Sequence, residues 1–180
     1  QIGLVDQDVS ATAGRGYQFK VDESEIKIGA EATADNGIKY GVNIELNAGA
    51  GDTSDADEAW AFVDSANWGR IEMGDQDDAT DRIYVESDDI LVGRAGPDGD
   101  VGDFISFGTG GGISATGNSS SGDATKLTYF TPRFSGFQLG GSITPDTGET
   151  SGGAATADSD ADGDFENVFG IGANYEGKFD

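Results

Sequence analysis

Acidic side chains are concentrated between residues 75 and 103, where ten carboxylates stand against two arginines. An excess of fixed negative charge attracts cations and can order dipolar solutes. Basic side chains outside this segment, above all Lys39 and Arg70, could supply the opposing charge. The residues of this candidate charged site are Lys39, Arg70, Glu72, Asp75, Asp77, Asp78, Asp81, Arg82, Asp88, Asp89 and Arg94. The competing interpretation is that the acids only solvate an exposed segment or reflect a saline habitat.

A second acidic motif, DSDADGD, spans residues 158–164. It places carboxylates at alternate positions around a glycine turn, a spacing typical of calcium-binding loops. The four candidate ligands are Asp158, Asp160, Asp162 and Asp164. The twelfth position from the start of the motif is Phe169, where an EF-hand needs a bidentate glutamate. We therefore expect no cofactor other than a weak Ca²⁺ site here, and a solvated acidic loop is the alternative.

Several kinds of chemistry are excluded by residues that the chain lacks. It contains no histidine and no cysteine, which removes most hydrolase triads, zinc sites, thiol nucleophiles and disulfides. Its formal net charge of −24 argues against a nucleic-acid partner, because binding to phosphates needs a basic surface. Nothing singles out an acid–base pair among the many carboxylates, so we do not expect an enzyme.

The segments that would position these charges alternate apolar and polar residues. Every even-numbered position from Ile38 to Ala50 is apolar, whereas polar residues and a glycine occupy most of the odd positions between them. A period of two predicts a β-strand with one apolar and one polar face. Crossing a bilayer takes about 9–11 tilted strand residues, and this segment is long enough. The same reasoning predicts eight strands, at about residues 1–8, 17–33, 37–50, 56–65, 69–75, 125–131, 137–144 and 166–176.

The expected connections alternate between two kinds. Tight turns follow the second, fourth, sixth and eighth strands, and long Gly- and Asp-rich segments follow the others. Short turns at one rim and long loops at the other are typical of a transmembrane β-barrel. Aromatic residues near the tight turns would form an interfacial girdle: Tyr40, Trp68, Phe134, Phe137 and Tyr175. Trp60 and Phe62 are candidates for a surface that faces lipid or a neighbouring subunit.

The chain resembles the general porins of Gram-negative bacteria, of the alphaproteobacterial type. Three segments carry the resemblance in the family's order: residues 36–48 (NGIKYGVNIELNA), 58–77 (EAWAFVDSANWGRIEMGDQD) and 126–146 (KLTYFTPRFSGFQLGGSITPD). The resemblance implies an all-β antiparallel transmembrane barrel of sixteen strands, of which about eight are present. It also implies a homotrimer, and a long third loop, residues 76–124, that folds into the lumen as the constriction.

A function follows from this resemblance as an expectation. The chain would be a passive diffusion channel for small hydrophilic solutes and ions across the cell outer membrane, and the acid-rich loop would make it prefer cations. Its other partners would be outer-membrane lipid and lipopolysaccharide. We expect one domain over residues 1–180, with the constriction loop at 76–124 and an acidic external loop at 146–165.

Two alternatives remain open at this point. The chain is about half as long as a sixteen-stranded porin, so we expect it to cover the N-terminal half of one, with its signal peptide already removed. A complete narrow barrel of eight strands is the competing possibility, although side chains would fill its interior and leave no room for a long inward loop. The other alternative is a secreted acidic β-sandwich that binds a ligand, possibly with calcium.

Overall fold

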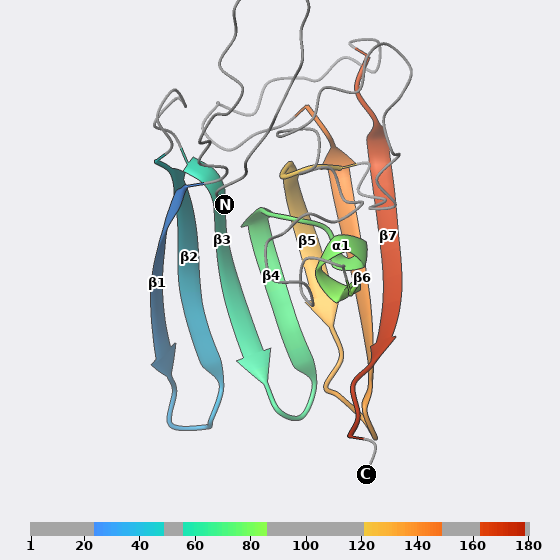
Figure 1. Cartoon of the computed structure of the whole chain (residues 1–180). Coiled ribbons are helices and arrows are strands. Elements are labelled where there is room, and N and C mark those ends of the chain that lie inside the picture. Colours follow the sequence, from blue (N-terminus) through green and yellow to red (C-terminus); the bar gives the residue numbers. More distant parts are fainter. Residues whose placement is uncertain (1–23, 49–55, 86–120, 149–162, 179–180) are drawn as a thin grey trace, which may run out of the picture. The chain divides into compact units, whose positions relative to one another are not determined.

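The computed structural model describes residues 24–48, 56–85, 121–148 and 163–178, and these form one antiparallel sheet (Figure 1). The sheet order is β1-β2-β3-β4-β5-β6-β7, the order along the chain. The elements are β1 (Glu25–Thr33), β2 (Lys39–Asn47), β3 (Ala56–Ser65), β4 (Gly69–Asp75), α1 (Ala79–Ile83), β5 (Thr125–Phe130), β6 (Phe137–Asp146) and β7 (Glu166–Tyr175). The predicted all-β, antiparallel class is confirmed, while the strand expected at residues 1–8 lies outside the described residues.

Nearly all described residues belong to one of two compact units into which the chain divides, namely residues 26–46, 54–84 and 118–180. The fold described below is that of this unit. None of the helical segments in the described ranges has the length and apolar character needed to span a membrane.

Strand pairing separates apolar from polar side chains onto two faces of the sheet. Glu72 of β4 lies opposite Phe62 of β3 and Thr128 of β5, and Thr128 lies opposite Ser142 of β6. The positions between these residues form an exposed apolar face that includes Val42, Val63, Ile71, Met73, Leu127, Leu139, Phe169 and Ile171. Ile171 is 83% exposed, so this face is stable only against an apolar surrounding.

Tight turns and long connections alternate along the sheet, as predicted. The turn between β1 and β2 is built on Asn36, whose side-chain oxygen accepts a hydrogen bond from the Ile38 amide at 3.2 Å. Gly37 in this turn has φ +82°, a left-handed conformation that glycine adopts without a steric penalty. Short turns also join β3 to β4 and β5 to β6, whereas 49 residues separate β4 from β5.

The aromatic side chains expected near the tight turns are exposed there. Tyr40, Trp68, Phe134, Phe137 and Tyr175 are all exposed. The rings of Phe137 and Tyr175 pack with their centroids 4.9 Å apart, and the Tyr129 hydroxyl donates to the Trp68 carbonyl at 2.6 Å. Aromatic residues that combine an apolar body with a polar tip suit the boundary between lipid and water.

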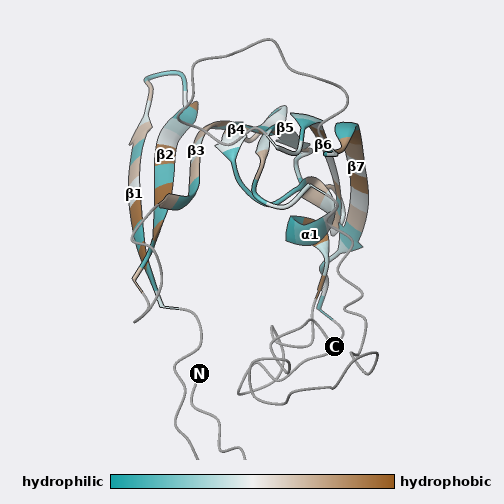
Figure 2. Cartoon of the chain, turned by 90° about the horizontal axis from the view of Figure 1, so that it is seen from above, coloured by the Kyte–Doolittle hydropathy of each residue, from teal (hydrophilic) through white to brown (hydrophobic). Residues whose placement is uncertain are grey.

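The short helix α1 lies against the polar face at β5, β6 and β7 (Figure 2). Asp78 caps its first turn by accepting hydrogen bonds from the amides of Thr80 and Asp81. Ile83 at its other end is buried with Ala79 and Phe130. This small cluster is the apolar contact between the start of the 76–124 segment and the sheet.

Candidate functional site

The polar face carries a buried ion-pair cluster that joins the sheet to α1. The Glu72 side chain is 0% exposed, and its two carboxylate oxygens accept from Arg70 of β4 and Arg82 of α1. Arg82 also donates to the Gln76 side chain at 2.9 Å. A buried carboxylate needs such partners, because an isolated charge without water is strongly destabilising. Glu72 therefore fixes the two guanidinium groups next to each other.

Aromatic rings lie beneath these arginines on the same face. The Arg70 guanidinium lies 3.8 Å from the Phe62 ring centroid, and that of Arg82 lies 5.8 Å from the Trp60 ring. The expectation that Trp60 and Phe62 face lipid or a neighbouring subunit is therefore wrong. Phe62 is paired with Glu72 and shares its polar face, where the ring supports a cation instead of contacting lipid.

Lys126 ties together the two ends of the long connection between β4 and β5. Its side chain is 1% exposed, and its ammonium donates to the carbonyls of Gln76 and, at 2.6 Å, of Gly122. The Ser121 hydroxyl adds a hydrogen bond to the Asp78 carboxylate. Both ends of the segment 76–124 are therefore fixed at the same place on the polar face.

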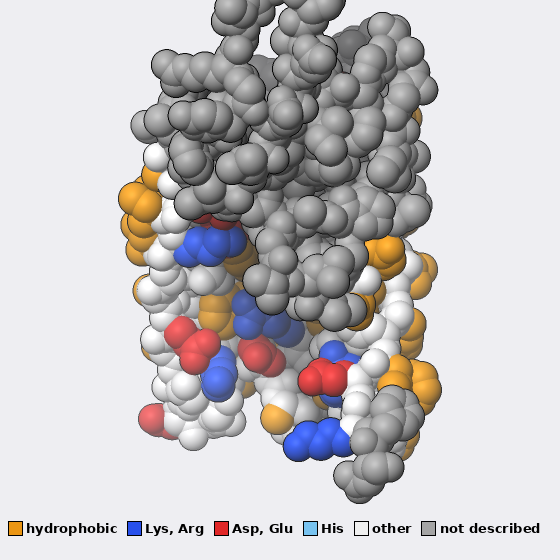
Figure 3. Space-filling view, in the orientation of Figure 1, with side chains coloured by type: hydrophobic (Ala, Val, Ile, Leu, Met, Phe, Trp, Pro, Cys, Tyr) orange, Lys and Arg blue, Asp and Glu red, His pale blue; other side chains and the backbone are white. Residues whose placement is uncertain are grey.

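Two further hydrogen bonds hold α1 to the far strands of the sheet. The Ala79 amide donates to the Ser142 hydroxyl of β6 at 3.2 Å. The Asn174 side chain of β7 donates to the Ile83 carbonyl at 3.1 Å. The beginning of the predicted constriction loop thus lies on the charged face of the sheet. Figure 3 shows Lys, Arg, Asp and Glu side chains gathered on the uncovered part of this face.

Three carboxylates gather at the end of the sheet that bears the long connections. Oxygens of Glu58, Asp77 and Asp123 lie within 4.8 Å of one another, and we call these residues the carboxylate cluster. The Asp77 amide donates to Glu58 at 2.8 Å, which holds the cluster together. A set of oxygen donors of this kind suits a hard cation such as Ca²⁺ or Mg²⁺.

Burial raises the pKa of Asp77 to about 7, and the charges of Glu58, Asp81 and Asp123 act in the same direction. Burial also raises the pKa of Asp123. Both shifts have the same physical origin, since desolvation and nearby like charges each disfavour a carboxylate. A proton bound by this cluster is therefore retained at a pH where an ordinary aspartate is ionised.

We expect the protein to unfold at a higher temperature at pH 5 than at pH 8, with Asp77 as one cause. A carboxyl whose pKa is raised by folding binds its proton more tightly in the folded state, so stability falls as pH rises from about 4 to 7. Asp77→Asn should reduce the difference between the thermal unfolding temperatures at pH 5 and pH 8, measured by circular dichroism in detergent. Asp35→Asn, in an exposed turn, is the control; an equal narrowing by both variants would contradict the assignment.

The structure distributes the predicted constriction residues among different roles. Asp77 belongs to the carboxylate cluster and Asp78 caps α1, while Asp81 lies in α1 and Asp75 accepts from Thr125. Lys39 of β2 pairs with Glu31 at 3.7 Å, and in the strand register it lies opposite Asp64, the residue that pairs with Arg70. Six other predicted residues lie outside the described ranges: Asp88, Asp89, Arg94, Asp158, Asp160 and Asp162. The proposed calcium motif is thus represented only by Asp164, which is exposed, and it stays a prediction.

The carboxylate cluster and the arginines nearest the tight turns lie at opposite ends of the strands. Glu58 lies near the start of β3 and Asp77 just beyond the end of β4, at the end with long connections. Arg70 lies near the start of β4, beside the tight turn, and Arg133 lies in the next tight turn. The sequence prediction did not include Glu58, Asp123 and Arg133. The alternating pattern could have pointed to Glu58 as a charged residue on the polar face of its strand, and the position of Arg133 in a short turn could have pointed to that residue.

These features together define the wall of a membrane channel: a sheet with an apolar exposed face, a charged opposite face, and a short helix that packs on the charged face at the start of the longest connection. The sequence pattern of the Gram-negative porins matches residues 1–180 of the chain. The chain therefore belongs to the Gram-negative porin family, whose members form outer-membrane β-barrel channels. No curated protein and no solved structure shows significant similarity to the chain.

Proposed function

We propose that this porin is a cation-preferring diffusion channel for small hydrophilic solutes. The observation that carries the proposal is the two-faced sheet, whose charged side carries the carboxylate cluster and the start of an acid-rich loop. Fixed carboxylates raise the local concentration of cations and lower that of anions, and low-dielectric walls strengthen the effect. The ten acids of residues 75–103 outnumber the two arginines of that segment.

We further propose that the channel assembles as a homotrimer within outer-membrane lipid and lipopolysaccharide. The exposed apolar face supports this part of the proposal, because side chains such as Ile171 and Phe169 need a lipid or protein surface. The exposed aromatics near the tight turns would mark one boundary of the membrane. Cross-linking in detergent micelles, read as the number of subunits per particle, tests the trimer.

Reversal potentials across a planar bilayer test the cation preference. With a KCl gradient across the channel, we expect the sign of the potential to show that K⁺ is more permeant than Cl⁻. The preference should weaken at high salt, where the fixed charges are screened. A potential of the opposite sign would show anion preference and would refute the proposal.

A further inference from the structure

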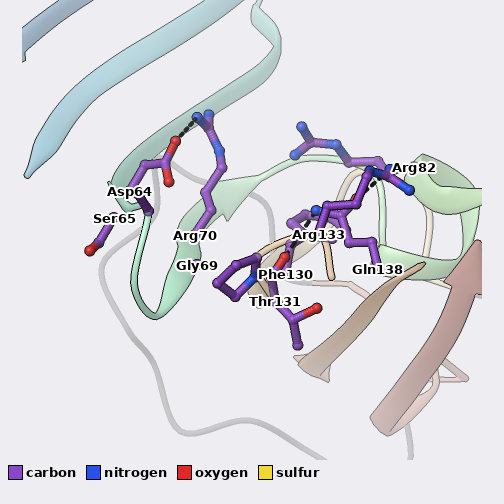
Figure 4. Close-up of a pocket in the computed structure, with 11 residues that line it drawn as sticks. Asp64, Ser65, Gly69, Arg70, Arg82, Phe130, Thr131, Arg133 and Gln138 are labelled. Atoms are coloured by element: carbon purple, nitrogen blue, oxygen red, sulfur yellow. Dashed lines mark hydrogen bonds and ion pairs between the residues drawn. The ribbon is translucent and has the colours of Figure 1, made fainter. Parts of the chain in front are cut away.

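A cavity of about 480 Å³ opens on the polar face near the tight turns (Figure 4). Its walls come from β3, β4, α1, β5, β6 and the turn between the last two. The polar side chains that matter for its chemistry are Arg70, Arg82, Arg133, Asp64 and Gln138. We call this cavity the arginine pocket. Its volume is in the range of sites that hold small molecules, roughly 300–1,000 Å³.

The charge of the arginine pocket is opposite to that of the chain. Three of the chain's five arginines line it, although the chain as a whole carries a formal charge of −24. Asp64 and the adjoining Glu72 supply two negative charges against these three positive ones. Glu176 approaches Arg133 at 3.5 Å, but its side chain is 81% exposed and therefore well screened by water. The pocket keeps an excess of positive charge.

The three guanidinium groups are held in place, and Arg82 keeps most of its donors for a ligand. Arg70 is held by Phe62 and Glu72, whereas Arg133 donates to the Gly136 carbonyl at 2.8 Å, to Asn174 at 2.9 Å and to Gln138 at 3.0 Å. Within the described ranges, the side-chain hydrogen bonds of Arg82 all come from Nη1, which leaves the N–H groups of Nε and Nη2 for a ligand. Groups fixed before binding lose little freedom when the ligand arrives.

We propose that the arginine pocket is a binding subsite for the carboxylate of a small organic anion, such as a dicarboxylate. A guanidinium presents two parallel N–H donors that match the two oxygens of a carboxylate, a geometry that chloride cannot use. The subsite deepens the proposed channel function, since solutes reach it only if the polar face is wetted, but it does not depend on cation preference. It would retain carboxylate-bearing solutes within a wall that otherwise repels anions.

Titration calorimetry of the intact channel in detergent, with sodium succinate, tests the subsite. We expect saturable binding of succinate, and none of succinamide or of sodium chloride at matched ionic strength. Binding to all three, or to none, would overturn the proposal. Calorimetry and the reversal potential are independent measurements. Absence of succinate binding would refute the subsite even if the reversal potential shows cation preference, and a reversal potential that shows anion preference would leave observed succinate binding intact.

Substitutions locate the binding. Arg133→Gln should weaken succinate binding about tenfold, the loss expected for one charge-assisted contact. Lys27→Gln removes the same charge from β1, where Lys27 pairs with Glu45 and does not line the pocket, and should change the affinity less than about twofold. If the glutamine variant does not assemble, Arg133→Lys takes its place, with a smaller loss in the same direction. Unchanged affinity at position 133, or an equal loss at position 27, would overturn the proposal.

Discussion

Gly172→Val is expected to lift α1 off the sheet and to raise the single-channel conductance. A Cβ at Gly172 would overlap the Cγ2 of Ile83, which is buried against the wall. The backbone at Gly172 is not in the left-handed region, so the substitution adds bulk without backbone strain. Overpacking of this kind costs about 1–3 kcal/mol.

The conductance should rise because α1 lies on the face that lines the proposed pore. Displacing Ile83 also breaks the hydrogen bond from Asn174 to the Ile83 carbonyl, so Ile83 loses both its packing against β7 and its hydrogen bond to that strand. Conductance in planar bilayers measures the opening, and thermal unfolding in detergent measures the cost. Both quantities should change together.

Gly141→Val is the matched control for this experiment. Gly141 lies on neighbouring β6 but faces the apolar side of the sheet, where an added Cβ would meet its nearest atom at 3.7 Å. We expect conductance and unfolding temperature close to those of the unaltered channel. If Gly172→Val assembles with unchanged conductance, or if both variants change it equally, the helix does not narrow the pore.

The strand pattern could be predicted from the sequence because its signals are local. Two expected strands, 56–65 and 69–75, coincide with β3 and β4, and others agree within a residue or two at most ends. Alternation fixes which side chains share a face, and glycine or asparagine fixes where the chain turns. The error at Trp60 and Phe62 came from equating apolar with lipid-facing, whereas the register places both beneath arginines.

The groupings on the polar face could not be predicted because they join distant segments. Glu58 and Asp123 are 65 positions apart, yet both approach Asp77. Likewise, α1 depends on the lack of a side chain at Gly172, nearly 90 residues later. An alternating pattern indicates that a residue faces inward, but only the relative positions of strands and loop decide which inward residues meet.

Lys126→Met is expected to release both ends of the 76–124 segment from the sheet. The ammonium of Lys126 is the shared donor to the carbonyls of Gln76 and Gly122, and its side chain is almost fully buried. Methionine fills a similar volume but donates no hydrogen bond and carries no charge. Leaving a buried carbonyl without its donor typically costs about 1–3 kcal/mol. Thermal unfolding and amide hydrogen exchange in residues 76–84 should both report the loss.

Lys39→Met is the control that distinguishes loss of the Lys126 hydrogen bonds from a general loss of positive charge. Lys39 also lies on the polar face, but it and Glu31 are each about half exposed and their ion pair spans 3.7 Å. Exposed pairs of this kind contribute about 0–1 kcal/mol, so this variant should unfold near the normal temperature. Faster exchange only in Lys126→Met would mean that one buried side chain holds the loop in the pore. Equal behaviour of the two variants would mean that the hydrogen bonds of α1 to β6 and β7 suffice without it.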